Sequence, residues 1–445
     1  MNSRKIAIVG SGIAGLSAAW LLARDNRVTL FEKAADLGGH TNTVTVQTGD
    51  GAVAVDTGFI VYNERNYPNL TALFDHLGVT TSPSSMSFAA SIRDGRMEYS
   101  GAHLNGLFGQ RRNIVRLEHW QLVRDILRFF RDAQAEVASV GPDVTIGEFL
   151  QRFGYSRTFV ADHILPISAA IWSTPARNML DFPARTFVEF FSNHGLMQVS
   201  GRPSWRTVTG GSRNYVERML AEVPLDIRTS ARIETVCRHI GGVEIFHAGG
   251  QREHFDELVL ACHADEALAL LSDATGAERE VLSAFRFTPN RAVLHTDPGF
   301  MPRRKRLWSS WNYISGGRAE EEKLSVTYWM NRLQPLPTSE NLFVTLNPHG
   351  DFAPEAVRYD TTYMHPLFDA RAIAAQKRLW QVQGVQNTWF AGAWMGYGFH
   401  EDGLQAGLEV AERIGTAKRP WSVPGHRARI AHNWAEGERV LWAAE

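Results

Sequence analysis

Cysteine is scarce in this chain of 445 residues, which contains only Cys237 and Cys262. The two are 25 positions apart, so neither a disulfide framework nor a cysteine-ligated zinc site is expected. Long apolar runs are missing too, because no stretch approaches the roughly 20 residues of a membrane span. The short apolar run in MNSRKIAIVG passes directly into a glycine motif, which favours a first β-strand over a secretory signal. These absences predict a cytoplasmic protein.

Neither sign of charge dominates, since 46 Lys and Arg stand against 47 Asp and Glu. Such a chain has no overall field to attract nucleic acid, so we expect no nucleic-acid partner. The GxSxG motif of serine hydrolases is missing, and the 16 His residues include no HExxH pair. We therefore expect no metal ion, and nothing in the composition predicts the oligomeric state. The length predicts two interwoven domains.

The N-terminal segment is the most informative part of the sequence. A β-branched run over residues 5–9 leads into Gly10-x-Gly12-x-x-Gly15, followed by a helical pattern over 13–24. A second strand over 28–31 ends at Glu32. The order strand, tight turn, helix, strand and acid predicts a dinucleotide site with the pyrophosphate at the helix N-terminus. Glu32 is expected to accept hydrogen bonds from the ribose.

A second glycine pair follows in Lys33 and the segment Gly38-Gly39-His40-Thr41. With the first motif it resembles the extended ADP-binding signature of FAD enzymes in the amine oxidase and phytoene desaturase superfamily. The resemblance implies FAD and a fold of two parts, a doubly wound, Rossmann-like α/β FAD-binding domain and an α+β substrate domain. His40 stands where the family usually has arginine, and we expect it to donate to a phosphate in a pH-dependent way.

Three later segments resemble the same superfamily. VDTGFIVYN, residues 55–63, resembles the segment beside the flavin; ARIETVCR, residues 231–238, resembles the strand that touches the adenine; and residues 389–415 resemble the strand, loop and helix that point at the flavin. The resemblance therefore implies the following cofactor-binding residues: Gly10, Gly12, Ile13, Ala14, Gly15, Glu32, Lys33, Gly39, His40, Thr41, Asp56, Gly58, Val236, Gly392, Glu401, Asp402 and Leu404.

The resemblance also predicts how the domains divide the chain. Residues 1–65, 205–270 and 385–418 form the FAD-binding domain, residues 66–204 and 271–384 the substrate domain, and residues 419–445 a C-terminal tail.

The chain departs from the amine oxidases at three places. Phe399 stands where they have tyrosine, Arg291 lies near the slot of their lysine, and Ala393 and Trp394 replace an acid. We therefore favour the desaturase precedent, in which a hydride leaves an apolar, unsaturated fatty acyl substrate by desaturation or double-bond isomerisation. An amine oxidase and a non-catalytic, flavin-holding lipid-binding protein remain as alternatives. No catalytic base is predicted, because the sequence does not rank His163, His194 and His295.

The segment 103–137 predicts a long amphipathic helix preceded by arginines. Apolar residues recur at helical spacing, at Leu117, Trp120, Val123, Leu127 and Phe130. One interpretation is a peripheral contact with the inner membrane through which a lipid substrate enters. The other is an ordinary core-facing helix with solvated arginines. Two aromatic segments, 164–175 and 307–313, suit either a substrate tunnel or a core.

Overall fold

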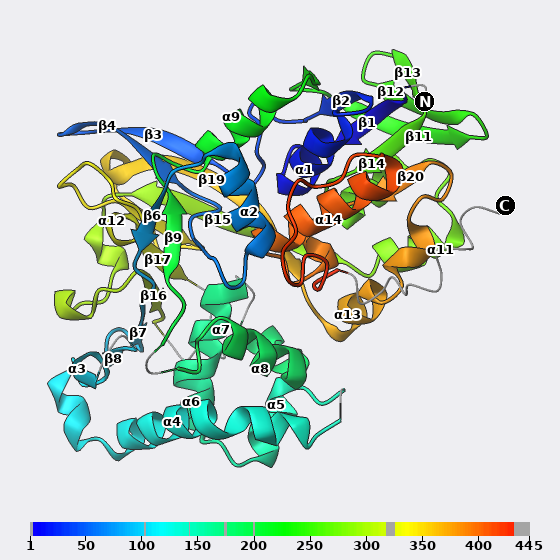
Figure 1. The fold of residues 1–445 in the computed structure, drawn as a ribbon. Helices are drawn as coiled ribbons and strands as arrows, with labels where there is room; N and C mark the ends of the chain where they lie inside the picture. The colour runs from blue at the N-terminus through cyan, green and yellow to red at the C-terminus, as the bar shows by residue number, and fades with distance from the viewer. Residues whose placement is uncertain are drawn as a thin grey trace.

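The computed structural model describes residues 3–101, 104–141, 143–172, 176–198, 201–316 and 325–430. A nucleotide-binding half at the upper right of Figure 1 adjoins a long mixed sheet, and a layer of helices lies at the bottom. Within these residues no helix is long and apolar enough to cross a membrane.

A five-stranded parallel sheet forms the centre of the nucleotide-binding half. Its order is β10 (Asp226–Arg228), β2 (Arg27–Phe31), β1 (Lys5–Val9), β14 (Glu257–Leu260) and β20 (Thr388–Phe390). Both predicted N-terminal strands are thus present, within one residue of their expected bounds. Segments far apart in the sequence meet in this sheet, as a doubly wound domain requires.

Helices α1 (Ile13–Leu22) and α14 (His400–Ile414) lie side by side against this sheet (Figure 1). Their backbones approach closely, because a Cβ added at Gly407 would lie 2.1 Å from the carbonyl oxygen of Ala14. Helix α1 ends two residues earlier than predicted, and α14 begins one residue earlier. The contact places both helix N-termini at the same edge of the sheet.

Smaller antiparallel units surround this core. They are the hairpin of β3 (Thr43–Thr48) and β4 (Gly51–Asp56), the sheet of β11 (Ile233–His239), β12 (Gly242–His247) and β13 (Arg252–Phe255), and the sheet of β5 (Tyr62–Asn63), β9 (Trp205–Val208) and β6 (Thr81–Ser84). Helices α2 (Pro68–Leu77), α9 (Arg213–Glu222), α10 (Ala264–Leu270), α11 (Gly276–Leu282) and α13 (Ala370–Gln376) complete this half.

A seven-stranded mixed sheet forms most of the other half. Its order is β19 (Val357–Leu367), β15 (Arg286–His295), β18 (Phe343–Leu346), β17 (Val326–Trp329), β16 (Trp311–Ile314), β7 (Phe88–Ile92) and β8 (Met97–Ser100). The helical layer below it contains α3 (Leu104–Leu107), the 3₁₀ turn η1 (Arg111–Val115), α4 (Leu117–Ala138), α5 (Ile146–Arg152), α6 (Arg157–Phe159), the π-helical turn η2 (Val160–Ile164), α7 (Leu165–Trp172), the 3₁₀ turn η3 (Ala176–Asp181) and α8 (Ala184–Asn193). Short turns elsewhere are α12 (Met330–Leu333), η4 (Pro298–Phe300), η5 (Lys305–Leu307), η6 (Pro354–Ala356), η7 (Leu379–Val382) and η8 (Ala393–Met395).

Two hydrophobic clusters underlie the two halves. Helices α11 and α13, assigned to the substrate domain, contribute Val281, Leu282 and Ala372 to the cluster of the nucleotide-binding half. Residues 419–430 of the predicted tail also pack there, because Trp421 stacks on Trp20 at 5.8 Å. Residues 431–445 lie outside the described residues. The division stays a proposal.

Helix α4 does not face the core with the stripe that its sequence suggests. Its buried face carries Leu122, Ile126 and Phe129, whereas Leu117 and Trp120 are exposed. Helix α4 therefore faces the core, with Val123 of the predicted stripe buried there as well. Leu117, Trp120 and Leu127 of the stripe are exposed, so α4 is apolar on two sides. His103 and residues 173–175 of the segments named above lie outside the described residues.

Candidate functional site

The turn between β1 and α1 gives the nucleotide motif its shape. Gly10 has a φ of +104°, and a Cβ there would lie 2.7 Å from the carbonyl oxygen of Ala261. A Cβ at Gly15 would lie 1.8 Å from the Gly10 oxygen. At Gly12, the N-cap of α1, a Cβ would meet no atom of the described residues within 4 Å. The turn thus leaves space in front of a helix N-terminus, where a pyrophosphate is favoured.

Ile13, Ala14 and Leu404 are buried in the packing of α1 and α14. A Cβ on Gly403 would lie 2.8 Å from Cγ2 of Ile13. Their side chains therefore form the helix interface, and a contact with the cofactor would have to come from their backbone. That contact stays a prediction.

Glu32 lies at the end of β2, and its carboxylate points towards the turn between β1 and α1. Its Oε2 accepts hydrogen bonds from the amide (2.9 Å) and hydroxyl (2.6 Å) of Ser11, and its Oε1 accepts one from the Ala34 amide at 2.8 Å. A ribose hydroxyl bound by Glu32 would compete with the Ser11 hydroxyl. Lys33 points elsewhere, to Glu266, and this hydrogen bond raises the pKa of Lys33.

The second glycine pair folds over the first motif. A Cβ at Gly39 would lie 3.1 Å from Cα of Gly12, and Gly39 has a φ of +58°. A Cβ at Gly58 would lie 2.1 Å from the carbonyl oxygen of His40, and the Phe59 amide donates to that oxygen at 2.7 Å. The structure therefore brings three predicted segments together through glycines for which any side chain would be too large.

His40 is buried among other histidines. Its ring lies 5.0 Å from that of Tyr363 and 5.5 Å from that of His365, centroid to centroid. Burial, and then the charges that His365, His263 and His400 would carry, lower the pKa of His40 to about 3. His40 is therefore neutral at physiological pH, so the expected donation to a phosphate would come from an uncharged imidazole; that donation stays a prediction.

Thr41 belongs to a second polar cluster that the sequence did not predict. Its hydroxyl lies 2.5 Å from the Tyr215 hydroxyl, which lies 2.6 Å from Nε2 of His400. The His400 ring stacks on Phe59 at 3.9 Å between centroids. Burial lowers the pKa of His400 to about 3, so this cluster is uncharged as well.

Asp56 holds three segments together. Its carboxylate accepts from the hydroxyls of Thr43 (2.6 Å) and Ser212 (2.7 Å) and from the Gln334 amide at 2.8 Å. Burial raises the pKa of Asp56 to about 6, against the effect of these hydrogen bonds. The side chain is satisfied within the protein, so its predicted place beside the flavin would involve the backbone.

The two acids at the start of α14 are also committed within the protein. Glu401 accepts from the Asn69 amide (3.0 Å) and the Leu70 amide (3.0 Å) at the N-terminus of α2. Asp402 accepts from the Phe399 amide at 2.7 Å and from Arg429 at 3.1 Å. Their carboxylates therefore fix the helix N-terminus in position. Whether its amides contact the cofactor stays a prediction.

Gly392 and Val236 occupy the remaining predicted positions. A Cβ at Gly392 would lie 2.2 Å from Nε1 of Trp394, so only glycine fits there. The Val236 carbonyl accepts from the amide (3.1 Å) and the hydroxyl (2.8 Å) of Ser272. An adenine contact through Val236 stays a prediction, and its carbonyl would have to be shared.

Phe399 connects the nucleotide-binding half to the helical layer. Its ring stacks on Phe190 of α8 at 5.1 Å and lies 5.9 Å from the ring of His194. Arg291, near the slot of the amine oxidase lysine, is instead exposed and forms an ion pair with Asp360 at 2.6 Å. The structure therefore does not support Arg291 as a counterpart of that lysine.

The three histidines that the sequence left unranked differ in their contacts. Both ring nitrogens of His295 have partners, the Thr345 hydroxyl and the Asp297 amide. His163 Nδ1 lies 3.0 Å from the Tyr99 hydroxyl. His194 Nδ1 donates to the Phe190 carbonyl at 2.9 Å, while its buried Nε2 has no partner among the described residues. His194 is thus the one of the three with a free acceptor beside Phe399.

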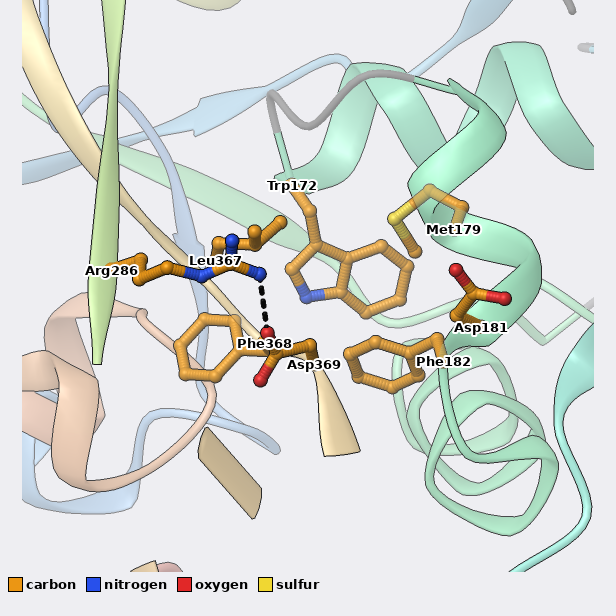
Figure 2. Close-up of a pocket in the computed structure, with 8 residues that line it drawn as sticks. All are labelled: Trp172, Met179, Asp181, Phe182, Arg286, Leu367, Phe368 and Asp369. Carbon is orange, nitrogen blue, oxygen red and sulfur yellow. Dashed lines mark hydrogen bonds and ion pairs between the residues drawn. The ribbon is translucent and has the colours of Figure 1, made fainter. Parts of the chain in front are cut away.

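A cavity of about 220 Å³ lies between the helical layer and the end of the mixed sheet (Figure 2). Three side chains of the helical layer, Trp172, Met179 and Phe182, face Leu367 and Phe368 across the cavity. Arg286 and Asp369 also line it and form an ion pair at 2.6 Å. Asp181 is the third charged residue of the lining. Phe368 also packs against the Gly398–Phe399 turn, since a Cβ at Gly398 would lie 2.9 Å from its Cε2. The lining is therefore mixed, with five apolar and three charged side chains, and Phe368 connects it to the turn before α14.

Several residues of the site belong to no sequence motif. Tyr215, Tyr363 and His365 reach the site from α9 and β19, which tertiary structure alone brings near His40. Pro68 at the start of α2 and the acids of α14 were the only sequence signals of the contact between these helices. Among the described residues no group of three or more His, Cys, Asp or Glu side chains is arranged to hold a metal ion.

Comparisons with known proteins agree with this geometry. The family described as an NAD(P)-binding Rossmann-like domain matches residues 8–77. A carotenoid phi-ring synthase from Streptomyces griseus is 44% identical over 70 residues, which are 15% of this chain and only 13% of that protein. The crystal structure of the CLA-producing fatty acid isomerase from P. acnes is 17% identical with a TM-score of 0.63, covering 92% of this chain and 98% of that one. Cyclohexylamine oxidase from Brevibacterium oxydans IH-35A is 16% identical with a TM-score of 0.65, covering 93% and 100%.

The predicted fold class is confirmed by these structures: the chain shares the fold of the fatty acid isomerase and of cyclohexylamine oxidase. The open space at Gly12, the enclosing Gly39 and the carboxylate of Glu32 are the features that FAD needs, so the residues present fit the predicted cofactor. Structures that share the fold at such low identity do not define the substrate.

Proposed function

We propose that this protein is an FAD-dependent oxidoreductase that desaturates or isomerises an unsaturated fatty acyl chain. The observation that carries the proposal is the cavity beside the Gly398–Phe399 turn, in which Trp172, Met179, Phe182, Leu367 and Phe368 form an apolar wall. At about 220 Å³ it is smaller than the roughly 300–1,000 Å³ of ordinary ligand pockets, so it suits part of a hydrocarbon chain. Each methylene transferred from water to such a site contributes about 0.8 kcal/mol.

FAD, when bound, supplies the acceptor for a hydride. The chain itself would hold the nucleotide at Gly12 and Glu32, and orient the acyl chain along the aromatic wall formed by Phe190 and Phe399. Desaturation also removes a proton from the neighbouring carbon. His194 is placed to accept it, because its Nδ1 proton is fixed by Phe190 and its Nε2 lone pair is free among the described residues.

Two similar proteins support a lipophilic substrate, one named as a fatty acid isomerase and the other as a carotenoid phi-ring synthase. An amine oxidase is the second candidate, because cyclohexylamine oxidase shares the fold. A non-catalytic lipid-binding role of the flavoprotein is the third. A cytoplasmic location with a peripheral contact to the inner membrane belongs to the main proposal, since its substrate would reside in a bilayer.

The test is reduction of the flavin without oxygen by unsaturated fatty acids of increasing length and by primary amines. We expect bleaching by the acids, with affinity rising with chain length until the cavity is filled. Met179→Trp should shorten the longest chain that binds tightly, whereas Leu180→Ala, at the neighbouring half-buried position outside the cavity lining, should not. Fast bleaching by a simple amine would favour the amine oxidase. The absence of bleaching by either class, together with no shifted double bond in the recovered fatty acid, would favour the non-catalytic role.

The proton acceptor has its own test. His194→Gln should slow bleaching by the acyl substrate at least tenfold while FAD binding and substrate affinity stay within about twofold. His163→Gln, a buried histidine bonded to Tyr99, is the matched control and should leave the rate unchanged. Equal rates for His194→Gln and the wild type would remove His194 from the mechanism.

A further inference from the structure

Exposed large hydrophobic side chains are concentrated in one place. Five of the seven in the described part of the chain lie on η1 and α4: Ile114, Val115, Leu117, Trp120 and Leu127. Val115 and Leu117 are 84% and 86% exposed, so they contribute nothing to the core. A contiguous apolar surface of this kind marks a contact with a partner or a membrane.

Basic side chains surround these residues. Arg112 and Arg116 both donate to the carbonyl oxygen of Arg96, the latter at 2.9 Å, which brings their two guanidinium groups together. The basic run at 303–306 adjoins them, because η5 packs on the loop before η1: a Cβ at Gly109 would lie 2.2 Å from Cδ2 of Leu307. We call the apolar side chains of η1 and α4 with these basic residues the α4 surface.

The charge of the α4 surface differs from that of the whole chain. Residues 94–98, 111–118 and 302–306 carry eight Arg or Lys and three acids, whereas the whole chain is balanced at 46 to 47. One of the three acids, Glu98, is buried and already paired with Arg304. Burial, and then Arg116 and Arg304, lower the pKa of Arg112, so the cations repel one another. An anionic partner would relieve that repulsion.

Trp120 lies beside the exposed apolar side chains of η1 and α4, as a tryptophan at a membrane interface does. Its ring lies 4.9 Å from that of Phe108, and its indole N–H donates to the Ile114 carbonyl at 2.8 Å. In Figure 1, α3 and α4 lie at the lower end of the molecule, far from the parallel sheet. Helix α4 packs on α8, the helix whose Phe190 stacks on Phe399. The α4 surface is therefore connected to the proposed acyl site by one helix.

We propose that the α4 surface docks on an anionic lipid bilayer, with Val115 and Leu117 entering the hydrocarbon boundary and the arginines meeting lipid phosphates. Apolar side chains flanked by arginines and a tryptophan match this boundary in both polarity and charge. A second copy of the chain would place the same cations opposite one another. This inference goes beyond the proposed reaction, and its test needs no turnover.

The test is flotation of the full-length holoprotein with vesicles of phosphatidylcholine alone or with 30% phosphatidylglycerol. We expect binding to the anionic vesicles only, weakened by 0.5 M NaCl because salt screens the arginines. Val115→Glu with Leu117→Glu should lower the partition coefficient at least tenfold. Charge reversal at Lys305 and Arg306 should lower it about fivefold for each charge removed.

Ile240→Glu is the matched control for the apolar change. Ile240 is fully exposed at the opposite end of the molecule, between β11 and β12, and its replacement should leave vesicle binding unchanged. All variants should keep the flavin spectrum and melting temperature of the wild type, because the replaced side chains are outside the core. The proposal is overturned if the wild type does not float, if the Glu variants float equally well, or if light scattering shows that the surface instead joins two chains. Each of these results leaves the acyl chemistry to be judged by its own assay.

Discussion

Gly12 offers a direct test of the nucleotide site, because its replacement separates cofactor binding from folding. A Cβ at this position would meet no atom of the described residues within 4 Å. The backbone of Gly12, with φ −64° and ψ 174°, is allowed for alanine. In the protein without its cofactor, the loss of a favourable N-cap residue and the smaller entropy of the unfolded chain act in opposite directions. We expect a net change within about 0.5 kcal/mol.

With FAD the result is different, because the added methyl group would occupy the space in front of the α1 amides. Overfilling a packed site costs about 1–3 kcal/mol. Since 1.4 kcal/mol corresponds to a factor of ten, the dissociation constant of FAD should rise roughly 5- to 150-fold in Gly12→Ala. The measurement is fluorescence titration of deflavinated protein with FAD, together with thermal unfolding of the same sample without FAD.

Two other glycines provide control variants for Gly12→Ala. Gly276 also begins a helix, α11, and a Cβ there meets no atom of the described residues within 4 Å, so Gly276→Ala should change neither property. Gly15→Ala should destabilise the protein itself, because its Cβ would lie 1.8 Å from the Gly10 oxygen. FAD affinity unchanged in a folded Gly12→Ala protein would refute the placement of the pyrophosphate.

Two further predictions concern charge. Glu32→Ala should raise the dissociation constant of FAD about tenfold, since loss of a charged hydrogen-bond partner costs about 1–3 kcal/mol. Ser11→Ala is the control: it frees Oε2 of Glu32 and should not weaken FAD binding. Equal titration curves for Glu32→Ala and the wild type would contradict the ribose contact. The second prediction is acid destabilisation between pH 6.5 and 3. Burial lowers the pKa of His40, His194 and His400 from 6.5 to about 3, so the unfolded chain binds more protons in this window and stability rises with pH there. As the pH falls through this window, each such histidine lowers the free energy of unfolding by about 1.4 kcal/mol per pH unit. Melting temperatures between pH 7.5 and 5 measure this loss of stability. A flat profile would show that these side chains are not buried in neutral form.

The sequence predicted those parts of the fold in which local pattern and tertiary structure agree. The β1–α1–β2 unit follows from residues that are neighbours in the chain, and at Gly10 and Gly15 a Cβ would collide with backbone oxygens. Residues 389–415 were expected to form a strand, a loop and a helix, and α14 lies within that segment. The roles of the acids at the start of α14 were not found, because Glu401 bonds to α2, more than 300 residues away.

Helix α4 shows why a periodic pattern alone was insufficient. Leu117, Trp120 and Leu127 follow helical spacing as well as the buried Leu122 and Ile126 do. Periodicity indicates that a helix has an apolar face, but when two faces are apolar it does not say which one the core covers. The histidines around His40 were missed for a related reason, since β19 and α14 bring them together only in the folded chain.

The charge state of the site bears on the choice between the two candidate substrates. His40, His365 and His400 are neutral because burial lowers each pKa to about 4 or below. The carboxylates of Asp56 and Glu401 are hydrogen-bonded to other parts of the protein. Both carboxylates are thus already paired, so no free anion remains among the described residues near His40 to bind an ammonium group. A hydrocarbon chain needs no such anion. In the proposed desaturation the flavin would take the hydride and His194 the neighbouring proton, so the alkene product is neutral and needs no anion from the protein, which favours the acyl chain over the amine.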